Sequence, residues 1–382
     1  MIKRYHVKDY HFGLVITSIC LSLYGIFVIG SAKESVQKNQ IQGLVIGFFA
    51  MLLVSLISYE FLLRFYYAYY AAAILLLVAV RFFGREVNHA RRWLVVGPLQ
   101  FQPSEVAKIL LILFFAQFIM KHEEKINKPS VLFSSIALVS VPWYLIYKQP
   151  DMSTSIVVLV IFCAMIYIGG LSYKIIGGVL AVAVPAFAIA LFLILQPDQE
   201  IIETYQQLRI LAWLQPDKYE NTQGYQQQNS ITAIGSGQLR GKGYKNNEVG
   251  SVKNGNFISE PQTDFIMAVA GEELGFFGCA LAVLLFGVAT GIVVHIGMRA
   301  PDLAGTLICA GVASHIGFQS FANIGVATGL LPNTGLPLPF ISYGSTSLVA
   351  LLAEIGIVLN VGLMAGTVKQ SQGSFALDLD LD

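Results

Sequence analysis

The sequence predicts an all-α, polytopic integral membrane protein with about ten transmembrane helices, and two observations lead to this prediction. Apolar residues make up 55% of the chain and charged residues only 12%, about half the charged share of an ordinary soluble domain. Long uncharged stretches also recur along the chain, and most reach the roughly 20 apolar residues that cross a bilayer. Because they lack the short alternating pattern of barrel strands, they favour a helical bundle.

The first expected span, residues 12–31, follows a short basic start with Lys3, Arg4 and Lys8. Its apolar stretch is too long for a signal peptide, so we interpret it as a retained helix. The other spans are expected at residues 41–59, 61–80, 104–121, 131–147, 153–171, 174–195, 274–297, 303–330 and 343–367. An even number of spans places both termini on one side of the membrane.

Three connections are longer or more irregular than a turn: residues 81–103, 196–262 and 331–343. Counted along the spans, all three lie on the face opposite the termini. If the termini are cytoplasmic, the basic residues in these loops oppose the usual cytoplasmic excess of Lys and Arg, and an anionic extracellular substrate would explain them. We expect a single transmembrane domain over residues 1–370, with these three extracellular loops, and a disordered tail over residues 371–382.

The four cysteines lie within apolar stretches, where a thiol usually serves as a small hydrophobe, so no disulfide framework is predicted. No spacing of His, Cys and carboxylates suggests a zinc site. His315, in the expected ninth span, is interpreted as a hydrogen-bonded packing residue.

The segment from residue 90 to residue 108 leads from a basic loop into a helix. Glu105 and Lys108 are three residues apart and share one helical face just inside the membrane. Since both would be costly against lipid, they point into the bundle or into a wet cavity. A binding site and a structural ion pair with interfacial anchors both stay open. The candidates in this segment are Arg91, Arg92, Trp93, Glu105 and Lys108.

Asp151 follows the fifth expected span, immediately after Lys148, Gln149 and Pro150. It begins the next apolar stretch within a residue or two. Asp often caps a helix at this position. Asp151 is therefore interpreted either as a helix cap or as a site residue.

A glycine-rich segment, residues 235–244, places four glycines around Arg240 and Lys242. A backbone of this kind can approach a phosphate closely, and the two cations can neutralise it. The pattern is not that of a P-loop, so nucleotide binding is poorly supported.

Carboxylates gather in the next segment, residues 260–275, around Asp264. Asp264 and Thr263 open a helix, so Asp264 is either a helix cap or a functional group beside a positive helix end. Three further carboxylates lie within about nine residues of Asp264: Glu260, Glu272 and Glu273. Clustered carboxylates raise one another's pKa, so one of these four side chains can act as a base near neutral pH.

The segment 329–344 contains three prolines and three glycines but no charge. Irregular apolar backbone survives at membrane depth only where it is buried in protein or lines a cavity. Ser342 in this segment is the last candidate substrate contact.

Taken in order, these segments resemble the SEDS family (shape, elongation, division and sporulation). The resemblance covers nearly the whole chain and rests on residues 91–108, 149–151, 235–244, 260–275 and 331–344. The third and fifth of them look more like the RodA branch, which serves elongation. The FtsW and SpoVE branches, which serve division and sporulation, stay open.

The resemblance implies a ten-helix enzyme of the bacterial cytoplasmic (inner) membrane that polymerises lipid II into β-1,4-linked glycan at the outer face, for cell elongation and shape. Asp264 matches the family's essential aspartate and would act as general base on the acceptor's 4-hydroxyl. Undecaprenyl diphosphate would leave from the opposite face of the donor sugar and be neutralised by cations. The substrate-binding candidates are Arg91, Arg92, Trp93, Glu105, Lys108, Asp151, Arg240, Lys242, Glu260, Thr263, Glu273 and Ser342.

The family also implies a class B penicillin-binding protein with transpeptidase activity as partner, with other membrane proteins of the elongation complex and membrane lipid as further contacts and no nucleic acid. No cofactor is assigned, and a divalent cation (Mg or Mn) stays open. A lipid II flippase or transporter is the first alternative, and a scaffold that only activates its transpeptidase is the second. The location of all unusual sequence on one face favours the enzyme.

Overall fold

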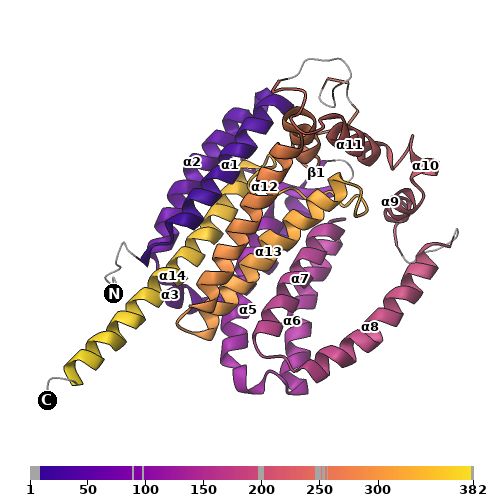
Figure 1. Cartoon of the computed structure of the whole chain (residues 1–382). Coiled ribbons are helices and arrows are strands. Elements are labelled where there is room, and N and C mark those ends of the chain that lie inside the picture. Colours follow the sequence, from indigo (N-terminus) through magenta and orange to yellow (C-terminus); the bar gives the residue numbers. More distant parts are fainter. Residues whose placement is uncertain are drawn as a thin grey trace.

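The computed structural model describes residues 9–87, 90–96, 99–196, 202–245, 251, 254–255 and 257–379, which form a bundle of long helices (Figure 1). Its first helices are α1 (Phe12–Ala32), α2 (Glu34–Leu56), α3 (Tyr59–Leu63), α4 (Tyr66–Phe83), α5 (Pro103–Lys121), α6 (Pro129–Tyr147) and α7 (Met152–Ile168). A short 3-10 helix, η2 (Glu123–Lys125), joins α5 to α6. The remaining helices are α8 (Tyr173–Ile194), α9 (Thr204–Leu214), α10 (Pro216–Tyr219), α11 (Tyr225–Ser236), α12 (Ile266–Met298), α13 (Leu303–Ala327) and α14 (Ser345–Leu379).

Within the described residues, nine helices are long and apolar enough to cross a bilayer, and α7 is a shorter apolar helix. The all-α membrane fold is thus confirmed, with ten spans when α7 is included. Three spans differ clearly from expectation. The expected span 41–59 is α2, which begins at Glu34 and ends at Leu56. The expected span 61–80 is divided into α3 and α4, and the expected span 274–297 belongs to a longer helix that begins at Ile266 and kinks at Gly275. The helix can begin earlier than the uncharged stretch because charged side chains in its first turns, such as Glu272, are buried against protein and not exposed to lipid.

The first predicted loop contains a small antiparallel sheet that the sequence did not predict. Its strands are β1 (Arg85–Val87), β2 (Ala90–Val96) and β3 (Leu99–Phe101), in the order β1-β2-β3. Arg85 pairs with Trp93, and Leu94 pairs with Phe101. The sheet ends directly before Pro103 at the start of α5, where a missing N–H costs nothing. It therefore fixes the entry of α5 into the bundle.

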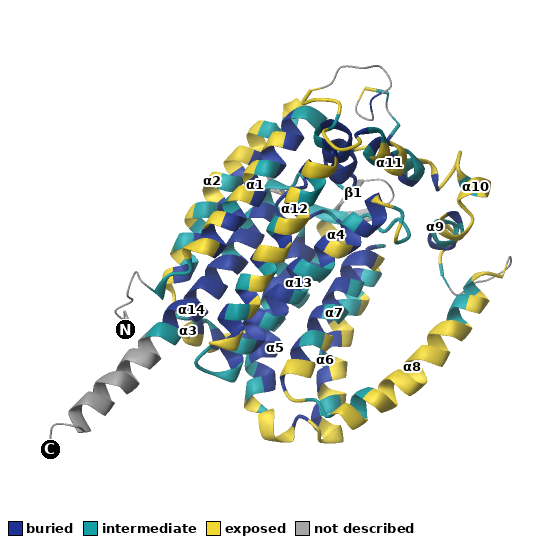
Figure 2. Ribbon diagram, viewed as in Figure 1, coloured by how far each residue is buried: buried dark blue, intermediate teal, exposed yellow. Residues whose placement is uncertain are grey.

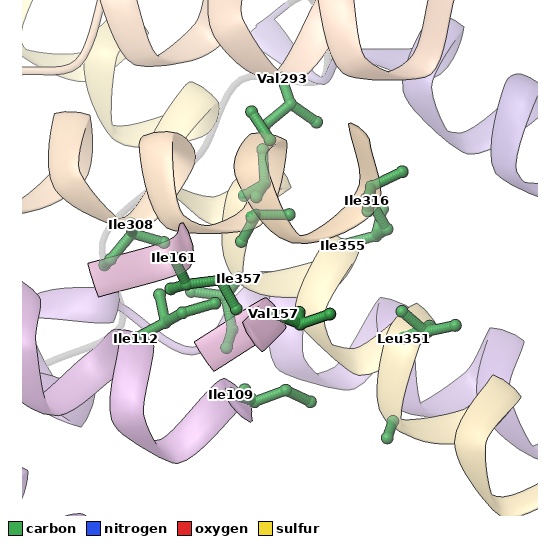
Figure 3. Close-up of a cluster of buried hydrophobic side chains, with 14 of the residues drawn as sticks. Ile109, Ile112, Val157, Ile161, Val293, Ile308, Ile316, Leu351, Ile355 and Ile357 are labelled. Carbon is green, nitrogen blue, oxygen red and sulfur yellow. The ribbon is translucent and has the colours of Figure 1, made fainter. Parts of the chain in front are cut away.

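The core lies between α5, α7, α12, α13 and α14. Figure 3 shows aliphatic side chains from these helices in one buried cluster, including Ile109, Val157, Val293, Ile316 and Ile355. Helices α2 and α14 also pack closely. A Cβ on Gly43 would lie 2.8 Å from Ser345 Cα, and one on Gly356 would lie 2.6 Å from the Met51 carbonyl oxygen. Small residues thus allow close helix contact, as is common in membrane proteins.

Helix α8 differs from the other spans because it stands apart from the bundle and none of its residues is buried (Figures 1 and 2). A helix that is apolar all round and uncovered by protein is suited to a lipid environment. It leads directly toward α9 and the long connection that follows.

The irregular connections gather at one end of the bundle, where β1 and helices α9 to α11 lie, and the start of α1 and the end of α14 lie toward the other end (Figure 1). Hydrogen bonds join these connections: Trp213 Nε1 donates to the Gly329 carbonyl at 3.0 Å, and Ser230 Oγ donates to the Ala327 carbonyl at 2.8 Å. The last turns of α14 overlap the predicted tail, but side chains beyond residue 366 and all of residues 380–382 lie outside the described part of the chain. The disordered tail stays a prediction.

Candidate active site

Asp264 lies at the end of the bundle where the irregular segments meet. The N-cap of α12 is Phe265, without a side-chain cap, so the helix-cap interpretation of Asp264 is wrong. Asp264 is partly buried, and a Cβ on Gly335 would lie 3.3 Å from its Oδ2. Asn323 Nδ2 donates to the Asp264 carbonyl at 2.8 Å and to the Leu336 carbonyl at 2.6 Å. One amide therefore fixes the aspartate backbone against the 331–343 segment.

Ser342 forms a second link between these two segments. Its Oγ donates to the Thr263 carbonyl at 2.6 Å and accepts from the Leu338 N–H at 2.8 Å. The Tyr343 N–H donates to the Gln262 carbonyl at 2.8 Å. The uncharged segment is thus anchored to the residues on both sides of Asp264, which explains how an irregular backbone is held at this depth. Ser342 acts here by fixing the loop.

Four charged groups surround the Asp264 carboxylate. Burial is the main influence and raises the pKa of Asp264 above its ordinary value; Arg209 and Arg92 oppose the rise, whereas Asp151 and Glu260 add to it. Desolvation disfavours the charged form, and so do neighbouring carboxylates. In the described part of the chain, no hydrogen bond forms to either carboxylate oxygen of Asp264. Burial and the neighbouring carboxylates thus favour the protonated form, and among the described residues the carboxylate takes no part in the hydrogen bonds that hold the fold.

Arg92, from β2, is tied to the connection between α6 and α7. Its Nε donates to the Gln149 carbonyl at 3.2 Å, and a terminal nitrogen donates to the Pro150 carbonyl. Asp151, the next residue, accepts from the Thr154 N–H at 3.2 Å and is the N-cap of α7. The cap interpretation of Asp151 is confirmed, and the same residue also acts electrostatically on Asp264.

Arg209, from α9, is the site residue that the sequence analysis missed. It is partly buried, and burial is the main influence that lowers its pKa, while Tyr205 and Asp264 oppose this effect. The only sequence signal is a lone basic residue in an amphipathic helix within a long connection. Nothing in that signal indicates which partner the helix will reach.

Glu105 and Lys108 form an ion pair with 2.8 Å between Oε1 and Nζ, and both side chains are almost fully buried. Lys108 Nζ also donates to Gln319 Oε1 at 2.8 Å, and Ser347 Oγ donates to Glu105 Oε2 at 2.9 Å. Gln319 Nε2 in turn donates to the Pro337 carbonyl at 2.9 Å. The pair is thus a buried ion pair, and it reaches the 331–343 segment through one amide.

The glycine-rich segment packs on α12 beside its kink. Lys242 Nζ lies 3.0 Å from Glu272 Oε1, and the Lys242 N–H donates to the Glu272 carbonyl at 2.9 Å. Glu273 accepts from Ser31 Oγ at 2.6 Å and from the Lys245 N–H at 3.3 Å. These carboxylates, which were expected beside Asp264, are therefore paired with other groups.

The glycines of this segment serve close packing. A Cβ on Gly237 would overlap the Gly271 carbonyl oxygen, and one on Gly241 would overlap the Glu273 carbonyl oxygen. Gly275 has a φ of 67°, and a Cβ there would overlap the Gly241 nitrogen. These glycines therefore allow the backbone of the 235–244 segment to pack directly on the backbone of α12. Close approach to a phosphate stays a prediction. Arg240 is exposed.

The remaining candidates lie around the same end of the bundle. Thr263 Oγ1 donates to the Glu260 carbonyl at 2.8 Å, and Glu260 pairs with Lys33 at 3.2 Å. Trp93 is partly buried in β2, and the side chain of Arg91 lies outside the described residues. These contacts give Glu260 and Thr263 structural partners close to Asp264.

Three buried polar atoms close to Asp264 have no hydrogen-bond partner among the described residues: Gln262 Oε1, Asn323 Oδ1 and Thr334 Oγ1. Unpaired buried polar atoms are uncommon and call for an explanation. Amide oxygens only accept hydrogen bonds, and a threonine hydroxyl can accept as well as donate.

A bundle of spanning helices, with a partly buried carboxylate and two arginines at one end, defines a multi-pass membrane protein with a candidate active site. The sequence profile of the FtsW, RodA and SpoVE family, described as cell cycle protein, matches residues 6–365, and the chain belongs to this family. The predicted SEDS membership is confirmed. The chain is thus a glycosyltransferase and a multi-pass protein of the bacterial inner membrane.

Relatives from both branches are similar to the chain. It is 38% identical over 294 residues to the peptidoglycan glycosyltransferase MrdB of Escherichia coli (strain K12), which covers 76% of each chain. It is 31% identical over 399 residues to the probable peptidoglycan glycosyltransferase FtsW of Bacillus subtilis (strain 168), covering 97% of this chain and 94% of the relative. The branch therefore stays open.

Two solved structures share the fold. The rod shape determining protein RodA of Thermus thermophilus has a TM-score of 0.68 and 30% identity, covering 92% of this chain and 96% of the other. A chain from a peptidoglycan synthase complex that coordinates polymerization and crosslinking has a TM-score of 0.77 and 31% identity, covering 93% and 98%. In each comparison the similarity extends over nearly the whole of both chains.

Proposed function

We propose that this protein polymerises lipid II into β-1,4-linked glycan at the outer face of the cytoplasmic membrane, with Asp264 as general base, and that it serves cell elongation and shape. One observation carries the proposal: the Asp264 carboxylate is partly buried, has a raised pKa and lies near Arg92 and Arg209. A base whose pKa lies closer to the working pH transfers protons more effectively.

The proposed reaction forms one bond and breaks one bond. Asp264 removes the proton from the acceptor's 4-hydroxyl as that oxygen attacks the anomeric carbon of the donor. The bond from this carbon to the undecaprenyl diphosphate oxygen breaks, and the diphosphate leaves with the bonding electrons. Attack from the face opposite the leaving group inverts the anomeric centre. The leaving group then needs positive charge in a region with little water.

Arg92 and Arg209 are the cations best suited to that charge. Lys108 is already paired with Glu105, and Lys242 is paired with Glu272. A guanidinium has five N–H donors, so Arg92 can keep its bonds to the carbonyls before α7 and still bind a phosphate oxygen. Arg209 loses hydration on burial, which strengthens its interaction with an anion.

A divalent cation stays an expectation. Within the described residues, no three His, Cys, Asp or Glu side chains are grouped as metal ligands. The diphosphate itself would supply most ligands to such an ion.

The unpaired atoms of Gln262, Asn323 and Thr334 support a sugar substrate. All three are covered by protein here, so the hydroxyls of a hexosamine would donate to them only after the 331–343 segment moves. Gln262 lies two residues before Asp264, Thr334 lies next to Gly335, and Asn323 on α13 donates to the Asp264 carbonyl, so a sugar bound by them would have a hydroxyl close to the base. This is why we favour transfer to a sugar over movement of lipid.

The proposed orientation places the termini in the cytoplasm and β1 to β3 with α9 to α11 outside. It rests on the chemistry of the substrate, because polymerised lipid II lies outside the cell. We also propose a class B penicillin-binding protein as partner, supported by the similar chain from a synthase complex that couples polymerization to crosslinking.

The test is polymerisation of purified lipid II by detergent-solubilised protein, with and without the transpeptidase and with Mg²⁺ or Mn²⁺. Asp264→Asn keeps size and hydrogen bonding but removes the base. We expect glycan from the parent and none from the variant. Polymer from both would remove Asp264 from catalysis, and none from either, with partner and cation present, would favour a flippase or a scaffold.

Asp302→Asn is the matched control. Asp302 Oδ1 accepts from the Gly305 N–H and from the Tyr59 hydroxyl, each at 2.8 Å, and it caps α13. The same chemical change there should lower stability and leave polymerisation intact. Thermal unfolding in detergent reports stability for both variants.

A further inference from the structure

A buried polar network in the membrane interior is not used by the proposed reaction. His315 Nδ1 lies 2.9 Å and 3.0 Å from the two Glu354 oxygens, and both side chains are about 1% exposed. His315 Nε2 lies 3.2 Å from Gln319 Oε1. Figure 3 shows Ile316 and Ile355, the sequence neighbours of His315 and Glu354, in the buried aliphatic cluster. Ionisable groups in such surroundings are costly and usually functional.

The orientation of the Gln319 amide follows from its partners. Its nitrogen faces the Pro337 carbonyl, and its oxygen faces the Lys108 ammonium, which can only donate. Gln319 Oε1 is therefore an acceptor, and His315 Nε2, which faces it, must carry a proton. Nδ1 faces a carboxylate with two oxygens at similar distances. The contacts fit an imidazolium bonded to an ionised Glu354.

Charges balance within the network. From α5 come Glu105 and Lys108, from α13 His315 and Gln319, and from α14 Glu354 with Ser347. Two cations and two anions then face one another, which is how charges persist away from water. Lys108 and His315 both donate to the one oxygen of Gln319, which uses both of its lone pairs.

The network ends at the segment that contacts Asp264. Gln319 holds the Pro337 carbonyl, and Pro337 is two residues from Gly335, against which the Asp264 carboxylate lies. An amide free to rotate would lose this bond. With two cationic donors on its oxygen, it cannot rotate without breaking three hydrogen bonds.

We propose that Glu354 and His315 are positioning residues: they form an ion pair in the membrane core that locks Gln319, and through Gln319 they hold the 331–343 segment against Asp264. The proposal rests on the proposed function of Asp264. Neither residue contacts substrate, so loss of the pair should lower kcat and leave KM nearly unchanged. Small errors in the placement of a catalytic group are sufficient to slow a reaction.

The first experiment reads the protonation of His315 and needs no activity. Nitrogen-15 NMR of the full-length protein labelled at histidine, with His315→Gln to assign the signal, should show two protonated ring nitrogens for His315 in the parent. An unprotonated Nε2 would overturn the lock. An unprotonated Nδ1 would place the proton on Glu354 and overturn the ion pair. Glu354→Gln should leave one unprotonated nitrogen.

The second experiment tests whether Glu354 acts through Gln319. We expect about a tenfold lower kcat for Gln319→Leu and a smaller fall for Glu354→Gln, because a neutral His315 donates more weakly to Gln319 than an imidazolium does. The double variant should fall no further than Gln319→Leu, because both changes act on the same segment. Effects that multiply would overturn the proposed route. If parent protein makes no polymer, the proposed function fails while the NMR result still decides the ion pair.

Asn360→Leu is the matched control on α14. Asn360 is fully buried, accepts from the Tyr59 N–H at 2.8 Å and donates to the Ser55 carbonyl at 2.8 Å, away from Gln319. It should lower thermal stability and leave kcat within twofold of the parent. If kcat fell as far in this variant, the loss of any buried polar side chain would slow the enzyme, and the positioning role of Glu354 and His315 would be rejected.

Discussion

The surroundings of Asp264 and the glycine-rich segment 235–245 both bring charged side chains to the same end of the bundle, yet their charges are used differently. Lys242 is paired with Glu272, and Glu273 is bonded to Ser31. Asp264, in contrast, has charged neighbours but no hydrogen bond to its carboxylate among the described residues. In the first region the charges hold a loop on a helix; in the second a carboxylate with a raised pKa has no hydrogen bond among the described residues. The pairing of the charges, more than their number, separates a site from a scaffold.

The largest expected difference between the regions is in rate. Asp264→Asn should reduce polymerisation by about 10³-fold, within the range of a lost general base, whereas Glu272→Gln should change it less than about threefold if its role is structural. Lipid II polymerisation by both purified variants measures this. Equal losses would erase the distinction between the two regions.

A glycine substitution should have the largest effect on stability. Gly275→Ala places a Cβ in a conformation that only glycine adopts easily, with φ 67° and ψ −159°, and against the Gly241 nitrogen. We expect a loss of about 3 kcal/mol or failure to fold. Thermal unfolding measures it.

Gly287→Ala is its matched control on the same helix, because no atom lies within 4 Å of the position of its Cβ. Alanine there should be neutral or slightly stabilising, by up to about 1 kcal/mol. If both variants behaved alike, the kink would not depend on glycine.

Arg209→Gln should move the pH dependence of the reaction. The base form of Asp264 exists above its pKa, so the rate rises with pH through that value. Arg209 opposes the rise in the pKa of Asp264; without it, the pKa increases further and the acidic limb shifts to higher pH. The kcat–pH profile tests the direction.

Two variants sharpen this test. Asp151→Asn removes a neighbour that raises the pKa of Asp264, so its acidic limb should shift to lower pH. Arg240→Gln removes an exposed cation and should shift neither limb. A shift in the same direction for Arg209→Gln and Asp151→Asn would show that the limb does not report Asp264.

The smallest effect is expected at Lys242. Its ion pair with Glu272 is partly exposed on the lysine side, and such pairs contribute about 0–1 kcal/mol. Lys242→Met should lower stability by that amount and leave KM for lipid II unchanged. A severalfold higher KM would support the predicted phosphate contact of Lys242 and would show that both regions bind the substrate.

Much of the chemistry was predictable from the chain alone. Asp264 was singled out by its position before a helix and by its family resemblance, and the Glu105 and Lys108 pair by its i, i+3 spacing. Arg209 was missed because α9 lies far from Asp264 in sequence. Glu354 was missed because a single carboxylate in an apolar stretch gives no sign of its partner. Glu272 and Glu273 were placed beside Asp264, since nearness in sequence is a poor guide along a helix that turns them to other neighbours.

The sequence by itself determined the membrane class and the approximate spans, because transfer of apolar helices from water to lipid depends on composition and length, which are local properties. Only the tertiary structure decided which charges meet. His315 pairs with Glu354, Lys242 pairs with Glu272, and Arg209 acts electrostatically on Asp264, each through the packing of segments distant in sequence. Electrostatic interactions depend on distance and burial, and both are set by that packing.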